Sequence, residues 1–315
     1  MAEESPLDLL ICSTCGSQHA VTTGLSSCKI CDDPRQYLPA HGQSWTTLRK
    51  LQDSKQYRNE FVIDKLAHQS GNKNLLLVSI YTVPKLAIGQ RALLCCTPRG
   101  NILWDCLTYI DDETVAKIND LGGVSAIVIS HPHYFTTCLH WAEAFGCKVY
   151  LSSEDGEWIM RRGDPARQAL WTGNRLPLLG PVGNDENKNE DGADFVAIKT
   201  GGHFPGSSVL WWKETRKLMV ADTIMVVPSG VYHIDRLPGT VSFSFMWSYP
   251  NFIPLPPDEV HNIWKAIRDT DFEDAHGAFV GQDTRGDSRR RVLESAKLIV
   301  KNMGYVGHAI HAEEA

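Results

Sequence analysis

The stretch Lys199-Thr-Gly-Gly-His-Phe-Pro-Gly-Ser-Ser-Val-Leu210 places two adjacent glycines and a histidine, His203, shortly before an apolar run. Glycine adopts backbone conformations that other residues resist, so Gly201 and Gly202 predict a sharp turn around the histidine. The apolar residues after Ser207 predict a strand. His203 is therefore expected in a loop at the end of a sheet, where many binding and catalytic residues lie.

Further candidate residues lie at other predicted strand ends. His131 and His133 flank a proline directly after the apolar run 124–130, and the proline fixes part of the backbone so that both imidazoles can face one crevice. Asp222 ends another apolar strand, and His276 stands just before a glycine. Each has a simple alternative, Asp222 as a turn cap and His276 as a loop residue. Four such features in this order, however, are much less easily explained by these alternatives.

With Asp105 at the end of one more predicted strand, these motifs make the chain resemble the metallo-β-lactamase superfamily over about residues 60–310. The Gly-His-x-Pro-Gly-Ser stretch is the most specific of them. The resemblance implies an α/β (α+β) fold, an αββα sandwich of two mixed sheets with helices outside, and a metal site where strand-end loops converge. It also implies the roles of the matching residues, with His131, His133, His203, Asp222 and His276 as metal ligands. Asp222 and Tyr134 are further predicted to be catalytic residues.

The sequence departs from the family pattern at the second metal. The family reads His-x-His-x-Asp-His, whereas Phe135 and Thr136 stand here where an aspartate and a histidine belong. A phenyl ring cannot bind a metal, but three histidines and a water form a complete catalytic zinc site. One catalytic zinc is therefore predicted, and a second metal is expected to bind weakly if at all. His140 is a possible substitute ligand, although a helix residue packing near the site is the favoured interpretation.

The N-terminal region contains a separate metal motif. Cys12 and Cys15 form one Cys-x-x-Cys pair, and Cys28 and Cys31 form a second, the spacing that lets four thiolates surround one tetrahedral Zn²⁺. A module of this size buries too little apolar surface to fold alone, so the zinc is expected to be structural. We predict a zinc ribbon at residues 1–45 and a hydrolase domain at residues 46–315. His19 is interpreted as a surface loop residue rather than a fifth ligand.

Composition narrows the classes of function. The 315 residues carry 31 basic and 37 acidic side chains, a net charge of −6, which disfavours nucleic acid as a partner. The acidic N-terminus does not resemble a signal peptide, and no apolar run approaches the ~18 residues of a membrane span. Nine cysteines, an odd number, favour reduced thiols over a disulfide framework. We therefore expect a cytoplasmic protein without membrane partners.

The expected secondary structure is mixed. Strands are predicted at 60–63, 75–81, 92–96, 101–106 and 124–130, and helices at 43–51, 112–121, 258–270 and 288–303. The charged residues 283–291 predict a solvated connection, and the polar run 184–191 predicts a loop tip. Trp158 and Trp171 could wall a pocket or pack in the core, and the aromatic stretch 241–256 predicts an apolar entrance. Tyr232-His233 is interpreted as a surface pair, with a hydrogen bond to substrate as the alternative.

These observations favour a zinc hydrolase that uses a zinc-bound hydroxide to open a lactam, lactone, ester or thioester in a small, apolar or aromatic molecule. Asp222 would orient the water or transfer its proton. A mononuclear iron oxygenase is the alternative enzyme, because histidines and a carboxylate also hold Fe(II). A non-catalytic metal-binding scaffold is the alternative of another class. The ribbon is a possible oligomerisation surface.

Overall fold

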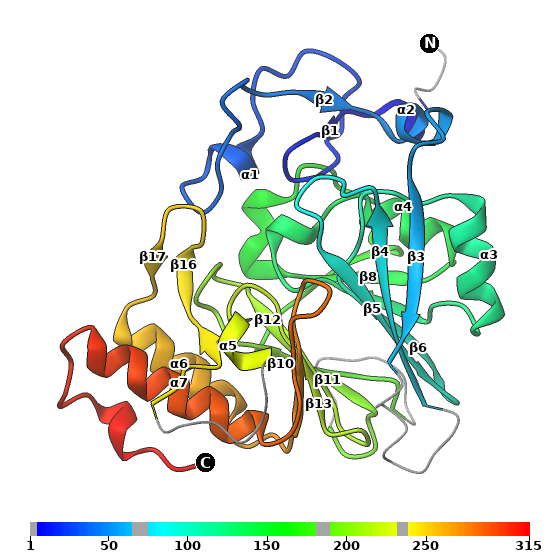
Figure 1. Ribbon diagram of the computed structural model, residues 1–315. Helices are drawn as coiled ribbons and strands as arrows, with labels where there is room; N and C mark the ends of the chain where they lie inside the picture. Colours follow the sequence, from blue (N-terminus) through cyan, green and yellow to red (C-terminus); the bar gives the residue numbers. More distant parts are fainter. Residues whose placement is uncertain (1–4, 65–74, 181–189, 232–238) are drawn as a thin grey trace. The chain divides into compact units, whose positions relative to one another are not determined.

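The computed structural model describes residues 5–64, 75–180, 190–231 and 239–315. The chain divides into two compact units, Met1–Trp171 and Thr172–Ala315, and each contains one large sheet (Figure 1). The expected domain boundary at residue 45 is not tested by this division and stays a prediction. Most of the polar run 184–191 and all of Tyr232-His233 lie outside the described residues.

The sheet of the first unit has seven strands in sequence order, antiparallel from β3 to β6 and parallel from β6 to β9. Its strands are β3 (Arg58–Ile63), β4 (Leu76–Val83), β5 (Arg91–Thr97), β6 (Gly100–Trp104), β7 (Ala126–Val128), β8 (Lys148–Ser152) and β9 (Gln168–Trp171). The four antiparallel strands and β7 confirm the strands expected from alternating or continuous apolar runs.

Short elements complete the first unit. They are η1 (Pro6–Asp8), β1 (Ile11–Cys12), α1 (Lys29–Asp32), β2 (Trp45–Thr46), α2 (Leu48–Asp53), α3 (Asp112–Asp120), η3 (Pro132–Tyr134), α4 (Cys138–Ala144) and η4 (Ser153–Trp158). The helix expected from residue 43 starts later, because Trp45 and Thr46 pair with β1. The Thr47 hydroxyl then accepts a hydrogen bond from the Lys50 amide (3.2 Å) and caps α2.

The sheet of the second unit has six strands in the order β10-β11-β12-β13-β18-β19, of which only the pair β13 and β18 is parallel. Its strands are β10 (Arg175–Leu178), β11 (Phe195–Lys199), β12 (Ser208–Trp212), β13 (Lys217–Met219), β18 (Asp274–His276) and β19 (Asp283–Thr284). Two short ribbons lie between β13 and β18 in sequence, β14 (Met225–Val226) with β15 (Phe243–Ser244), and β16 (Met246–Ser248) with β17 (Ile253–Pro254).

Two long helices supply the core of the second unit. The remaining helical elements are α5 (Pro228–Val231), α6 (Pro257–Ile267), α7 (Ser288–Asn302) and η5 (Ala309–Ala312). Apolar residues of α6 and α7, among them Ile263, Trp264 and Ala296, pack in one cluster with Val196 and Leu218 of the sheet. Each fully buried aliphatic side chain contributes roughly 1.5–3 kcal/mol of transfer free energy. The predicted helices are confirmed, because their apolar residues recur at helical spacing.

The predicted solvated connection at 283–291 is wrong. Thr284 and Ser288 are completely buried and joined by a 2.7 Å hydrogen bond, and Arg291 is 4% exposed. The segment forms an edge strand and the start of α7 instead, so some of its polar side chains lie inside the unit, whereas Arg290 is half exposed. Within the described residues, every helix is too short or too polar to cross a bilayer.

Candidate metal centres

The histidine pair of the first unit stands on a short loop after β7. Asp105, with φ +61°, ends the neighbouring strand, and its carboxylate accepts a hydrogen bond from the Ser130 amide (2.7 Å). The Ser130 hydroxyl in turn lies 2.8 Å from Nδ1 of His131. His131 and His133 are both buried, with ring centroids 5.1 Å apart. The loop therefore holds the two imidazoles close together, as the motif predicts, and a contact at Nδ1 fixes the first ring.

The residues after this pair are buried as well. The Tyr134 ring packs against His131, with centroids 4.4 Å apart, and Tyr134 is fully buried. Its proposed catalytic role stays a prediction. Phe135 is also buried, so a phenyl ring occupies the interior at this point of the family motif. Nε2 of His140 lies 3.1 Å from the Pro6 carbonyl oxygen, which agrees with the interpretation of His140 as a packing residue of a helix.

The glycine-rich turn of the second unit positions His203. Gly202 has φ +88°, and a Cβ there would lie 3.0 Å from side-chain atoms of both Leu255 and Ile263, so glycine is required for backbone and space. The Ser207 hydroxyl accepts a hydrogen bond from the Phe204 amide (2.8 Å) and closes the turn. Nδ1 of His203, which is 1% exposed, donates to the Met246 carbonyl (3.2 Å). Because Nδ1 carries the proton, Nε2 is the basic nitrogen.

Asp222 lies beside this histidine. Its Oδ2 is 3.8 Å from Nε2 of His203, and the residue is 7% exposed. The Thr223 hydroxyl donates to the Gly201 carbonyl (3.2 Å), and the Tyr249 hydroxyl donates to the Asp222 carbonyl (2.7 Å). Burial and the charge of Asp222 raise the pKa of Tyr249 well above its usual value, so Tyr249 stays a neutral donor. An imidazole and a carboxylate are thus held together by hydrogen bonds to the backbone.

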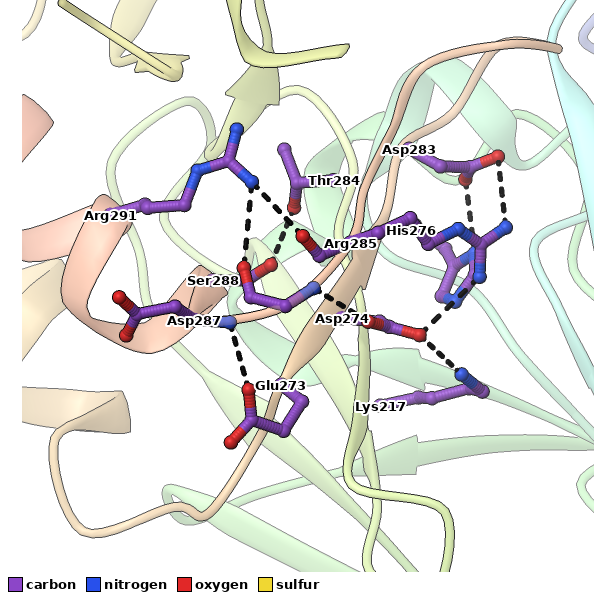
Figure 2. A network of polar contacts seen from close by, with 11 residues as sticks. Lys217, Glu273, Asp274, His276, Asp283, Thr284, Arg285, Asp287, Ser288 and Arg291 are labelled. Atoms are coloured by element: carbon purple, nitrogen blue, oxygen red, sulfur yellow. Dashed lines mark hydrogen bonds and ion pairs between the residues drawn. The ribbon is translucent and has the colours of Figure 1, made fainter. Parts of the chain in front are cut away.

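His276 belongs to a buried polar network in the second unit (Figure 2). Its Nδ1 lies 3.0 Å from Oδ1 of Asp283, and the other carboxylate oxygen of Asp283 lies 3.8 Å from Arg285. Arg285 also contacts Asp274 (3.4 Å), which accepts a 2.6 Å hydrogen bond from Lys217. Burial lowers the pKa of His276, and the hydrogen bond to Asp283 opposes this shift. The imidazole is therefore favoured in its neutral form with a defined orientation.

The other ring nitrogen of His276, Nε2, is buried and has no hydrogen-bond partner among the described residues. Among those residues, His276 does not form a compact ligand group with His203 and Asp222. Its role as a metal ligand stays a prediction.

The four cysteines of the N-terminal motif converge. Their sulfur atoms all lie within 4.8 Å of one another, and all four are buried free thiols. Cys12 ends β1, whereas Cys28 directly precedes α1 and Cys31 lies within it. A hydrogen bond from Cys15 lowers the pKa of Cys12 to about 6, which favours the thiolate that binds metals. The cluster confirms that the two Cys-x-x-Cys pairs form one potential metal site.

The surroundings of this cluster correct the interpretation of His19 and add a contact to the sulfur of Cys12. His19 is not a surface residue, because it is 6% exposed and stacks edge-on against Trp45 with centroids 5.0 Å apart. The Gln43 amide donates to the Cys12 sulfur (3.3 Å), a contact that the sequence does not indicate. Trp171 is buried, which supports the core-packing alternative for it, whereas Trp158 is buried and also lines a pocket with Ile159 and Arg161, as the other alternative expects.

Comparison with known proteins agrees with these features. The sequence profile of the metallo-beta-lactamase superfamily matches residues 90–273, more than half of the chain. The chain belongs to the metallo-β-lactamase superfamily. YmaE, an uncharacterized protein of Bacillus subtilis (strain 168), is 37% identical to this superfamily member over 274 residues, which cover 85% of the chain and 88% of YmaE.

Solved structures share the fold of this superfamily member at low sequence identity. The peroxy diiron species of the chemotaxis sensor ODP matches with a TM-score of 0.53 and 13% identity, over 78% of this chain and 99% of that chain. The DIM-1 metallo-beta-lactamase exposed to ceftazidime matches with a TM-score of 0.50 and 14% identity, over 77% and 98%. These matches confirm the predicted α/β fold class.

Sequence reasoning missed three residues that support the candidate ligands. Met246 and Tyr249 were assigned only to an aromatic stretch, and Asp283 was placed in a solvated segment. Met246 and Tyr249 carry no local signal, because they contact residues 43 and 27 positions away in the chain, whereas Asp283 lies seven residues from His276 and contacts it only because β18 and β19 pair.

Proposed function

We propose that this protein is a metal-dependent hydrolase that opens a lactam, lactone, ester or thioester in a small, apolar or aromatic substrate. The observation that carries the proposal is the pairing of His203 with Asp222, a basic imidazole nitrogen and a carboxylate 3.8 Å apart. Superfamily membership supports joining them with His131 and His133 as ligands of one catalytic ion. Zinc is proposed for that ion and for the four-cysteine cluster.

The donor set suits a borderline-soft divalent metal. Imidazole nitrogens with their other nitrogen engaged are typical zinc ligands, and both His131 and His203 have such contacts at Nδ1. A metal held there supplies Lewis acidity and lowers the pKa of a coordinated water to about 7. The four buried thiols offer no open position for substrate, which supports a structural role for the cysteine cluster.

Other residues prepare the reaction. The Tyr249 hydroxyl and the Thr223 hydroxyl fix the turn that carries Asp222, so its carboxylate is pre-positioned to orient a water or accept its proton. A carboxylate that is 7% exposed keeps few competing water contacts. Small neutral substrates agree with the chain's acidic net charge, which disfavours nucleic acid.

An iron oxygenase is the second candidate, supported by the fold match to a protein described as a diiron species. Metal content separates the two. We would purify the full chain, measure zinc and iron, and assay an ester, lactone, thioester and β-lactam panel together with oxygen uptake. His203→Ala is the test variant, and His41→Ala, an exposed histidine, is the matched control.

We expect zinc-dependent hydrolysis that His203→Ala abolishes and His41→Ala retains. Oxygen uptake by an iron-loaded protein would instead establish the oxygenase. A filled metal site without turnover of any member of the panel would favour the non-catalytic scaffold.

A further inference from the structure

The hairpin β16–β17 is bonded to both candidate ligands of the second unit, through Met246 at the start of β16 and Tyr249 in the turn. The Met246 carbonyl accepts from His203, and the Tyr249 hydroxyl donates to the Asp222 carbonyl. The Tyr249 ring also lies 6.0 Å from the His203 ring, centroid to centroid. The hairpin is therefore part of the immediate surroundings of this histidine and carboxylate.

The tip of the same hairpin is apolar and exposed. Phe252 is 83% exposed and Ile253 is 41% exposed. The whole stretch from Gly239 to Pro257 contains no charged residue. Single exposed apolar residues are common on protein surfaces, but this tip carries two neighbouring ones on a hairpin that is bonded to both candidate ligands.

The backbone of Phe252 is unfavourable for this residue. Its amide donates to the Tyr249 carbonyl (3.2 Å) and closes a tight turn, after which Phe252 has φ +54°. Hairpins place glycine at such a left-handed position, and a bulky residue there is an outlier of the kind that clusters at functional sites.

The tip is also held in one conformation. The Ser248 hydroxyl accepts hydrogen bonds from the backbone and side-chain nitrogens of Asn251 (3.3 and 3.2 Å). Pro250 and Pro254 restrict the backbone on both sides of the phenylalanine. A rigid apolar tip loses little entropy when it binds a ligand.

We propose that Phe252, supported by Ile253, is a specificity-determining residue that binds an uncharged apolar group of the substrate, so that acyl compounds with a long alkyl or aryl group are preferred over short ones. The preference among hydrolysed esters rests on the proposed function, whereas the binding of an apolar group by Phe252 does not. The same hairpin carries Phe252 and makes the hydrogen bonds to the two candidate ligands through Met246 and Tyr249.

The test uses the zinc-loaded full chain with p-nitrophenyl acetate and p-nitrophenyl octanoate. We expect wild type to have a higher kcat/KM for p-nitrophenyl octanoate than for p-nitrophenyl acetate. Phe252→Gly should lower this octanoate-to-acetate ratio of kcat/KM about tenfold. Phe252→Leu should keep most of the preference, because leucine is also apolar. Val306→Ser, which changes a 72% exposed apolar residue elsewhere in the second unit, is the matched control and should leave the ratio unchanged.

Two further measurements distinguish a failure of the proposed recognition from a failure of the proposed hydrolase activity. Phe252→Gly should unfold at the same temperature as wild type or higher, because glycine relieves the left-handed strain. Calorimetry with the free carboxylates octanoate and acetate compares their binding affinities and so measures recognition without turnover. If neither ester is hydrolysed but octanoate binds more tightly and Phe252→Gly loses that difference, the recognition stands and the hydrolase proposal fails.

An unchanged ester ratio in Phe252→Gly would overturn the inference while leaving the hydrolase intact. Loss of binding to phosphatidylcholine vesicles, or of a dimer in sedimentation, with an unchanged ratio would also overturn it. Those results would assign the tip to a lipid surface or to a second copy of the chain.

Discussion

Replacing Lys217 by methionine tests the buried network of the second unit. Its ammonium lies 2.6 Å from Oδ2 of Asp274, and the two side chains are only 5% and 13% exposed. Removing one partner of a buried ion pair costs about 3–5 kcal/mol, because the other charge stays buried without compensation. Asp274 keeps the Gly286 amide (2.9 Å) and the Arg285 guanidinium (3.4 Å), so we expect the lower end, about 3 kcal/mol.

The neighbouring residue provides a matched control. Arg216 forms ion pairs with Asp271 (2.7 Å) and Glu273 (2.8 Å) that are about half exposed. Exposed pairs contribute about 0–1 kcal/mol, so Arg216→Met should change stability much less than Lys217→Met. The double variant Lys217→Met/Asp274→Asn removes the uncompensated charge. It should therefore be more stable than Lys217→Met alone, by about 1 kcal/mol or more.

The pH dependence gives a second test. Burial opposes ionisation of Asp274, but the hydrogen bonds from Lys217 and the Gly286 amide outweigh it and hold the pKa of Asp274 below its usual value. A carboxyl group whose folded pKa is lowered stabilises the protein above its unfolded pKa of about 3.9. That contribution disappears as the pH falls through the folded pKa. The difference between wild type and Lys217→Met should therefore narrow below about pH 4.

Urea denaturation followed by tryptophan fluorescence, at pH 7 and at pH 3.5, measures these differences. The reasoning would be refuted by a loss at pH 7 no larger than that of Arg216→Met. It would equally be refuted by a double variant less stable than Lys217→Met.

Three further predictions concern the metals. Cys12→Ser should lower the melting temperature and remove one metal ion per chain, because three sulfurs cannot replace the four that converge. Cys147→Ser, outside the cluster, should keep the metal, and full stability and zinc content in Cys12→Ser would contradict a structural site. His203→Ala should lose the catalytic metal and turnover but keep a wild-type circular dichroism spectrum, and normal kinetics with retained metal would exclude His203 as a ligand. Elemental analysis after dialysis should give about two metal ions per chain, one in each site, because Phe135 and Thr136 cannot serve as second-site ligands of the family type; a stable total of about three would show that the mononuclear interpretation is wrong.

Several features could be predicted from the sequence because their signals are local. The two Cys-x-x-Cys pairs indicate a four-sulfur cluster, since a spacing of two residues brings two thiolates to one side of a turn. Gly202 indicates the turn around His203, because its φ of +88° disfavours other residues. The strand and helix periods follow from which side chains must be buried. Together these signals determined the superfamily and the fold class.

Other features depended on which strands pair, and only the tertiary structure decided them. Asp283 contacts His276 because an edge strand pairs antiparallel with β18, and the same pairing buries Thr284 in a segment whose charges predicted solvent. Lys217 meets Asp274 because β13 and β18 are parallel neighbours in register. A charged side chain looks the same in sequence whether water or a buried partner compensates it. The free energy of such a pair depends on which backbone segments lie side by side, and that arrangement is set by the whole fold.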